Sequence, residues 1–296
     1  MKTVIYNIGT LAGILPADVR KLEGAQMNHV ECIENAYLVI EDGIIAEFGK
    51  MSESVILNGT NGHVILNETK DHVILNGTKW SEESLGERSF ADAQDDNKGR
   101  QEDKIEYIDA KGGFVLPAFC DSHTHIVYAG CRDGEFRDKI AGLSYEEIAA
   151  RGGGILNSAD LLHETSEDEL YEQAMVRVRE IMAMGTGAVE IKSGYGLTVE
   201  DELKMLRVIK RIKETAPITV KANFLGAHAV GRAYRGRQAE YVDLVCNEML
   251  PKVAEEGLAD YVDVFCDAGF FTVDETARIL EKAANYGIRP KIHANE

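Results

Sequence analysis

The sequence predicts an α/β fold, in which an incomplete (β/α)8 barrel of the TIM type, with about five βα units, follows a small amino-terminal β module. After Ile105, short runs rich in β-branched residues alternate with longer runs whose apolar residues recur at helical spacing. Most of the helical runs end at a glycine, where a left-handed cap is expected. The first 51 residues, in contrast, contain only strand-like runs.

The amino-terminal part contains a short β module and an unusual insertion. TVIYNI and AYLVIEDGIIAEFG are rich in strand-forming residues, and Asp42-Gly43 supplies a two-residue hairpin turn. Similar runs, VILNGT, VILNET and VILNGT, then begin at Val55, Val64 and Val73. They could stack as rungs of a small solenoid, but we favour a duplicated insertion that is poorly ordered or weakly β. The acid-rich run from Ser81 to Asp103 has few apolar residues, which predicts a disordered linker.

The sequence therefore divides into three parts. Residues 1–51 and 104–116 form the β module, residues 52–103 form the insertion, and residues 117–296 form the barrel. The predicted strands of the barrel are FVLPAFCDSHTH, GAVEIKSGYG, ITVKANFLGAH, YVDVFCDAG and PKIHANE. The predicted helices are SYEEIAAR, EDELYEQAMVRVREIMAMG, EDELKMLRVIKRIKET, AEYVDLVCNEMLPKVAEEG and VDETARILEKAANYG. A closed barrel has eight strands and about 250 residues, so we expect a fragment that lacks three βα units.

Composition excludes several classes of function. A net charge of −18 disfavours binding to nucleic acid and to anionic membrane surfaces. No run of apolar residues is long enough to span a membrane, and the amino terminus does not read as a secretion signal. Because the five cysteines show no CxxC spacing, we expect reduced thiols in a cytoplasmic protein. We expect Cys120 to belong to the core, because strand alternation places it opposite His123.

The strongest chemical signal is His123-Thr124-His125 at the end of the first barrel strand. Residues i and i+2 of a strand share a face, so the two imidazoles are predicted to converge on one point. Paired core histidines are the alternative, but barrel strands carry their reactive residues at their carboxyl ends. His293, on the fifth strand, is a plausible third ligand. These donors suit Zn²⁺ or non-haem iron equally well.

Several longer runs resemble imidazolonepropionases, which belong to the metal-dependent amidohydrolase superfamily. The runs are LPAFCDSHTHIVYAGCR, GLSYEEIAARGGGILNSA, GTGAVEIKSGYGLTVEDELKMLRVIKR, FLGAHAV, ADYVDVFCDAG and KIHANE. The resemblance implies a hydrolase of histidine degradation that opens the ring of 4-imidazolone-5-propanoate to give N-formimidoyl-L-glutamate. It also implies a β-sandwich for the amino-terminal module and one Zn²⁺ or Fe ion held by His123, His125 and His293. The family's fourth ligand, an aspartate on the last strand, has no counterpart here.

The resemblance also implies four residues that contact the substrate. They are Arg132, Tyr195, His228 and Glu296. Arg132 would pair with the propanoate carboxylate, Tyr195 would reach the substrate with its hydroxyl, and His228 would stabilise charge on the ring oxygen. Glu296 would act as the catalytic base. The plainer alternatives are a surface arginine, a core tyrosine, a buried histidine and a frayed terminus.

Two further questions stay open at the level of sequence. Lys192 could bridge two metals if it were carboxylated, but the resemblance favours a one-metal site, with Lys192 in a structural ion pair. The function could also be that of another cyclic amidohydrolase or a deaminase, or the chain could be a non-catalytic remnant. In each enzymatic case the partner is a small molecule, and a homodimer is possible. Because three βα units are missing, we expect this chain by itself to have little activity.

Overall fold

The computed structural model describes residues 1–15, 19, 21–51, 57–58, 64–66, 73–76, 105–131, 133–144, 147 and 154–294. The chain divides into two compact units, Met1–Pro117 and Ala118–Glu296. Most of the predicted insertion, including the acidic linker, lies outside the described residues. Within it, each of the three repeats supplies one short strand: β4 (Leu57–Asn58), β5 (Val64–Leu66) and β6 (Val73–Asn76). These strands pair in the order β4-β6-β5.

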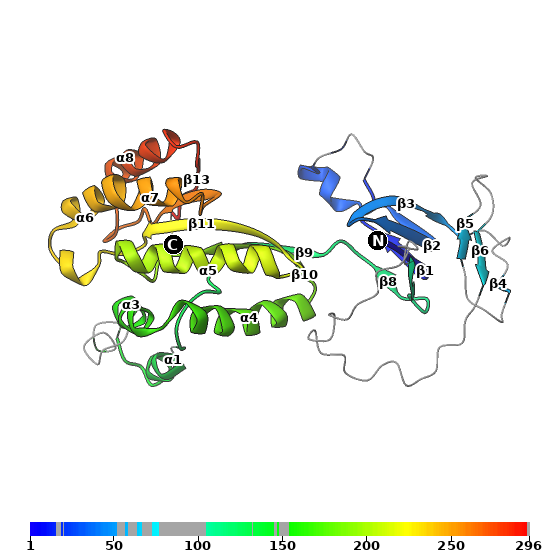
Figure 1. The fold of residues 1–296 in the computed structure, drawn as a ribbon, viewed down its shortest axis with the longest axis horizontal. Coiled ribbons are helices and arrows are strands. Elements are labelled where there is room, and N and C mark those ends of the chain that lie inside the picture. Colours follow the sequence, from blue (N-terminus) through cyan, green and yellow to red (C-terminus); the bar gives the residue numbers. More distant parts are fainter. Residues whose placement is uncertain are drawn as a thin grey trace, which may run out of the picture. The chain divides into compact units, whose positions relative to one another are not determined.

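The first unit is built on one mixed sheet (Figure 1). Its strands are β1 (Lys2–Ala12), β2 (Cys32–Glu41), β3 (Ile44–Lys50), β7 (Ile105–Asp109) and β8 (Phe114–Val115), and a short 3-10 helix, η1, spans Gly24–Asn28. The order is β3-β2-β1-β7, and β8 also pairs with β1. Asp42 and Gly43 both have positive φ, as the tight β2–β3 turn requires. The three short strands β4, β5 and β6 form a second sheet within this unit, and the predicted β-sandwich stays a prediction.

The second unit is an α/β structure with a parallel five-stranded sheet (Figure 1). Its strands are β9 (Phe119–Thr124), β10 (Thr186–Lys192), β11 (Thr219–Ala227), β12 (Tyr261–Val264) and β13 (Arg289–Pro290). Each strand pairs in parallel with the next one in the chain. Strands are found in all five predicted places and in the predicted order, but the fifth is shorter than predicted: β13 shares only Pro290 with the run PKIHANE, and His293 forms an isolated bridge beyond it. Parallel pairing in chain order brings the carboxyl ends of all five strands to one edge.

Three of the helices that connect these strands begin at a capping side chain. The segments after β9 include α4 (Glu167–Ala183), α5 (Val199–Thr215), α6 (Gln238–Leu244), η4 (Val245–Met249), α7 (Leu250–Glu255) and α8 (Val273–Ala284). Ser166, Thr198 and Thr272 each accept a hydrogen bond from a backbone N–H three residues further on. The segments α6, η4 and α7 make up one predicted helix. Pro251 has no N–H to donate to the carbonyl four residues earlier, and the turn before it is a π-helix.

The helices bury one continuous apolar core against the sheet. Helices α4 and α5 pack on each other and against β10 and β11, and α8 packs against β12 and β13 (Figure 1). Leu206, Ile209, Phe224 and Val262 are all fully buried in this core. Two helices that the sequence analysis did not predict, α1 (Asp133–Ile140) and α3 (Ile155–Glu164), follow β9. The predicted helix SYEEIAAR lies mostly outside the described residues.

One prediction about the core is wrong. Cys120 was expected to be buried, but it is exposed. Strand β9 is the edge strand of the sheet and pairs only with β10, and its neighbouring Phe119 is 69% exposed. Strand alternation fixes which way a side chain points, but burial also requires an element that covers that face.

None of the helices in the described part of the chain has the length and hydropathy that crossing a lipid bilayer requires.

Candidate active site

Five of the predicted site residues lie where the parallel strands end. His123 lies near the end of β9 and His125 directly follows that strand. Tyr195 belongs to the loop after β10, and His228 follows β11. His293 forms an isolated bridge with Phe265, just beyond β12. Four of the eight histidines therefore lie at one edge of the sheet.

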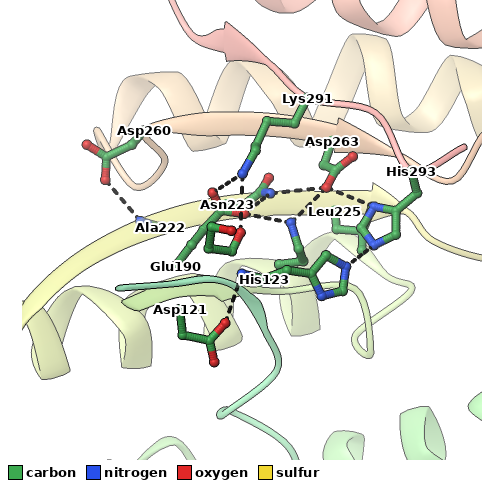
Figure 2. Close-up of polar contacts among 12 residues, drawn as sticks. Asp121, His123, Glu190, Ala222, Asn223, Leu225, Asp260, Asp263, Lys291 and His293 are labelled. Carbon is green, nitrogen blue, oxygen red and sulfur yellow. Dashed lines mark hydrogen bonds and ion pairs between the residues drawn. The ribbon is translucent and has the colours of Figure 1, made fainter. Parts of the chain in front are cut away.

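His123 and His293 are in direct contact. Their Nε2 atoms face each other, and their ring centres are 4.5 Å apart. On the other side of the His293 ring, Nδ1 lies 2.9 Å from Oδ2 of Asp263. Figure 2 shows His293 between Asp263 and His123. A carboxylate behind Nδ1 fixes the ring so that Nε2 points away from it, which is how proteins orient histidines that bind metals.

Asp263 is held in its ionised form by its neighbours. Its residue is only 2% exposed, and burial by itself raises the pKa of a carboxyl group. The contact with His293 and the ion pair with Lys192, whose Nζ is 2.9 Å from Oδ2, outweigh this effect and hold the pKa of Asp263 well below its usual range. Asn223 donates a further hydrogen bond of 3.2 Å to the same oxygen.

Lys192 lies in a buried ion pair, as predicted. Its Nζ donates to Glu190 at 2.6 Å as well as to Asp263. Lys291 pairs with the second oxygen of Glu190, and Asn223 donates 2.8 Å to the first. The lysine is thus surrounded by two carboxylates that require its positive charge, and this favours the ammonium form over a carboxylated lysine.

His125 lies on the other side of His123, among aromatic rings. Its ring centre is 6.3 Å from that of His123, 4.7 Å from that of Tyr195 and 5.3 Å from that of His228, with which it is stacked. Burial, and then the charge of His228 and other basic neighbours, lowers the pKa of His125 to about 3. At neutral pH the ring is therefore uncharged, which is the form that binds metals.

His228 is fixed by the backbone of the loop after β10. Its Nδ1 lies 3.0 Å from the carbonyl oxygen of Gly194. A carbonyl oxygen can only accept, so Nδ1 carries the proton of the neutral ring. The nitrogen that could face a substrate is therefore Nε2, and it donates a hydrogen bond only when the ring is protonated.

The side chains suit a metal ion in kind, but they do not enclose one. Zn–N bonds of about 2.1 Å put the ring centres of two ligating imidazoles roughly 5 to 6 Å apart, a spacing near those between His123 and its two partners. His125 also has a buried Nδ1 without a hydrogen-bond partner among the described residues. Nevertheless, no three potential ligand groups in the described ranges are arranged to hold an ion. The structure brings His123 together with His293, and it leaves His125 beside Tyr195 and His228.

Two predicted site residues cannot be placed. Arg132 and Glu296 both lie outside the described residues. The sequence analysis in turn missed Asp263, Glu190 and Asn223. Each of the three lies between two apolar residues of its strand, and this was the signal that could have revealed them. A cavity of about 320 Å³ opens beside His123, Lys192, Asp263, Lys291 and His293.

Comparisons with known proteins connect this chain to one enzyme family. No protein-family model matches the chain. Imidazolonepropionase from Flavobacterium johnsoniae is 48% identical over the whole chain, and that from Flavobacterium psychrophilum is 47% identical. The chain is imidazolonepropionase-like. The enzyme from Clostridium tetani is 40% identical over 92% of the chain. The imidazolonepropionase-like chain spans 61% of the length of the two Flavobacterium relatives and 55% of the length of the Clostridium relative.

Solved structures support the α/β fold. A 5-methylcytosine deaminase from Klebsiella pneumoniae superimposes with a TM-score of 0.52 at 16% identity, and the match covers 99% of this chain and 51% of the deaminase. A triazine hydrolase variant gives a TM-score of 0.51 at 11% identity and covers 100% of this chain and 53% of the hydrolase. At such low identity the imidazolonepropionase-like chain shares a fold with these enzymes, and the comparison says nothing about its substrate.

Proposed function

We propose that this chain carries the metal-binding site of an imidazolonepropionase, which opens the ring of 4-imidazolone-5-propanoate by hydrolysis and yields N-formimidoyl-L-glutamate in histidine degradation. The observation that carries the proposal is the contact between Nε2 of His123 and Nε2 of His293, with Asp263 behind His293. Two histidines from distant parts of the chain meet through the nitrogens that a metal would use, and a carboxylate fixes one of them.

The metal ligands in this proposal are His123, His125 and His293, and the ion is one Zn²⁺ or Fe. When bound, it would supply Lewis acidity towards the substrate and the attacking water. Asp263 keeps the Nε2 atom of His293 aimed at the site. The lowered pKa of His125 keeps that ring uncharged and able to bind.

The substrate-side roles are proposals as well. Arg132 would pair with the propanoate carboxylate through two parallel hydrogen bonds. Tyr195 lies beside His125 and His228 and would contact the substrate with its hydroxyl. His228 would bind the ring oxygen through Nε2 in its protonated form, since Nδ1 donates to Gly194. Glu296 would move a proton from the attacking water to the leaving nitrogen.

A deaminase or another cyclic amidohydrolase is the neighbouring alternative. The relatives at 40–48% identity favour imidazolonepropionase, whereas the likeness to a deaminase is one of fold alone. We also propose that the partner is a small molecule and, because the five cysteines lack CxxC spacing, that the protein works in the cytoplasm.

The test measures metal and substrate on the same protein, purified without chelator. His123→Gln and His293→Gln are each expected to weaken zinc binding by at least about 100-fold, because losing a ligand costs more than losing the carboxylate behind it. His29→Gln is the matched control, since His29 is an exposed histidine of the other unit, paired with Glu31. Consumption of 4-imidazolone-5-propanoate, compared with an aminated ring, separates hydrolysis from deamination. Zinc binding that is equal in all four proteins would refute the site.

A further inference from the structure

The loop Ser193–Leu197, which carries Tyr195, is built around one buried carboxylate. Backbone N–H groups of Gly194, Gly196 and Leu197 donate to Glu202, at 3.0, 2.8 and 3.0 Å. Gly194 donates to Oε2, and the other two donate to Oε1. Glu202 lies in the first turn of α5 and is 0% exposed. A single side chain therefore binds three backbone groups of the loop at once.

Gly194 and Gly196 leave no space for a side chain. A Cβ atom at Gly196 would lie 2.4 Å from the backbone nitrogen of Glu202, and one at Gly194 would lie 2.9 Å from Nδ1 of His228. Gly194 also has a φ of +106°, which side chains rarely allow. The two glycines let the loop press against α5 on one side and against His228 on the other.

The same loop determines which ring nitrogen of His228 carries the proton. Gly194 gives its N–H to Glu202 and its carbonyl oxygen to Nδ1 of His228, so one residue links the carboxylate to the imidazole. The ring of Tyr195 lies 5.4 Å from that of His228 and 4.7 Å from that of His125. The positions of both rings therefore depend on where the loop is held.

We propose that Glu202 is a positioning residue, which holds the loop so that His228 keeps its proton on Nδ1 and turns Nε2, with Tyr195 beside it, towards the candidate active site. The consequence for catalysis rests on the proposed function, but the effect on His228 does not. Burying a carboxylate is costly, and burial raises the pKa of Glu202 despite its hydrogen bonds. If this position of α5 served only the stability of the core, an apolar residue would serve better than a carboxylate.

Glu202→Gln tests this proposal in the full chain. The amide keeps the shape, but it places an NH₂ group where an oxygen now accepts a backbone hydrogen bond, so one side of the loop is released. In ¹⁵N-histidine spectra, we expect His228 to change from the Nδ1–H tautomer to a mixture of both tautomers. The His228→Gln variant assigns the signal. Asp201→Asn is the matched control, because Asp201 is the neighbouring buried carboxylate on α5 and contacts Thr198 and His163 instead.

Kinetics on 4-imidazolone-5-propanoate separate the two proposals. For Glu202→Gln, we expect kcat to fall by about 10- to 100-fold with KM changed little, because His228 acts on charge that develops during the reaction. If the tautomer changes in Glu202→Gln but the wild type shows neither turnover nor zinc binding, the proposed function is overturned and the positioning role stays intact. An unchanged tautomer in folded Glu202→Gln would overturn the positioning role.

A measurement on the wild type covers the case in which Glu202→Gln does not fold. The amide hydrogens of Gly194, Gly196 and Leu197 are bonded to a fully buried acceptor, so we expect them to exchange with solvent at least about 100-fold more slowly than in an unfolded chain. Exchange at unprotected rates would show that the carboxylate does not hold the loop, and would overturn the proposal.

Discussion

Carboxylates that the sequence analysis did not single out position the histidines at the carboxyl edge of the sheet. Asp263 contacts Nδ1 of His293, and Glu202 binds the loop that bonds Nδ1 of His228. Both carboxylates are buried, and each is surrounded by donors. A buried charge without partners is strongly destabilising, so the donors and the carboxylates depend on each other. For this reason the orientation of the histidines depends on the side chains behind them.

His163 provides a test of electrostatics at an exposed position. Its Nδ1 lies 2.9 Å from Oδ2 of Asp201, and this hydrogen bond raises the pKa of His163. The folded state therefore binds this proton more tightly than the unfolded state, in which a histidine has a pKa of about 6.5. The contribution to stability is fully present below that pH, and it disappears as the pH rises through the higher pKa of the folded state.

The measurement is a titration of the His163 ring by NMR. We expect a pKa above the ordinary histidine value in the wild type and a return towards that value in Asp201→Asn. The stability difference between pH 6 and pH 8 should also shrink in Asp201→Asn. Equal pKa values for His163 in the two proteins would show that the bond to Asp201 is not formed in solution.

At the scale of elements, helix α5 connects the core with the site. Its amino-terminal turn holds Glu202 and the cap residue Thr198, while its apolar face supplies fully buried residues such as Leu206 and Ile209. Packing of that face fixes the helix against the sheet, and the position of the helix in turn fixes the carboxylate under the loop. A substitution that disturbs the packing of α5 should therefore lower the free energy of unfolding.

Leu206→Ala tests the packing of α5. Deleting the side chain of a fully buried leucine removes apolar contacts and leaves a cavity, which typically costs about 2 to 5 kcal/mol. Lys210→Ala, at an exposed position of the same helix, should change the free energy of unfolding by less than about 0.5 kcal/mol. Chemical denaturation of both variants checks this expectation. A Leu206→Ala variant as stable as the wild type would mean that this face is not packed.

At the scale of the whole molecule, the apolar cores are separate. One large cluster contains residues of the second unit only, such as Leu206 and Phe224. Two small clusters, around Val4 and around Ile8, belong to the first unit. A unit with its own core can in principle unfold by itself.

We therefore expect two unfolding transitions. Ile8→Ala should lower the midpoint of one transition and Leu206→Ala the midpoint of the other, because the two residues belong to different clusters. In the double variant, the losses in the free energy of unfolding of the two single variants should add to within about 0.5 kcal/mol. Differential scanning calorimetry of the four proteins provides the measurement. A single transition that moves in both single variants would contradict this expectation.

Much of the second unit could be predicted from the sequence, because its signals are local. Helical spacing of apolar residues, caps such as Thr198 and Thr272, and β-branched runs specify the helices and strands of the parallel sheet. The same signals place His123, His125 and His293 at strand ends. Helix α3 was missed, and its residues offer only a short apolar pattern without a side-chain cap.

The sequence by itself determined the type of fold, the order of the strands and the set of histidines that gather at one edge. These follow from the spacing of apolar residues and from the alternation of strands and helices along the chain. Only the tertiary structure decided that His123 meets His293, that Asp263 orients His293, and that Glu202 binds the loop of Tyr195. It also decided that Cys120 is exposed. The contacts of His293 join residues far apart in the chain, the bonds to Glu202 depend on how the loop folds back onto the start of α5, and burial depends on whether another element covers a face.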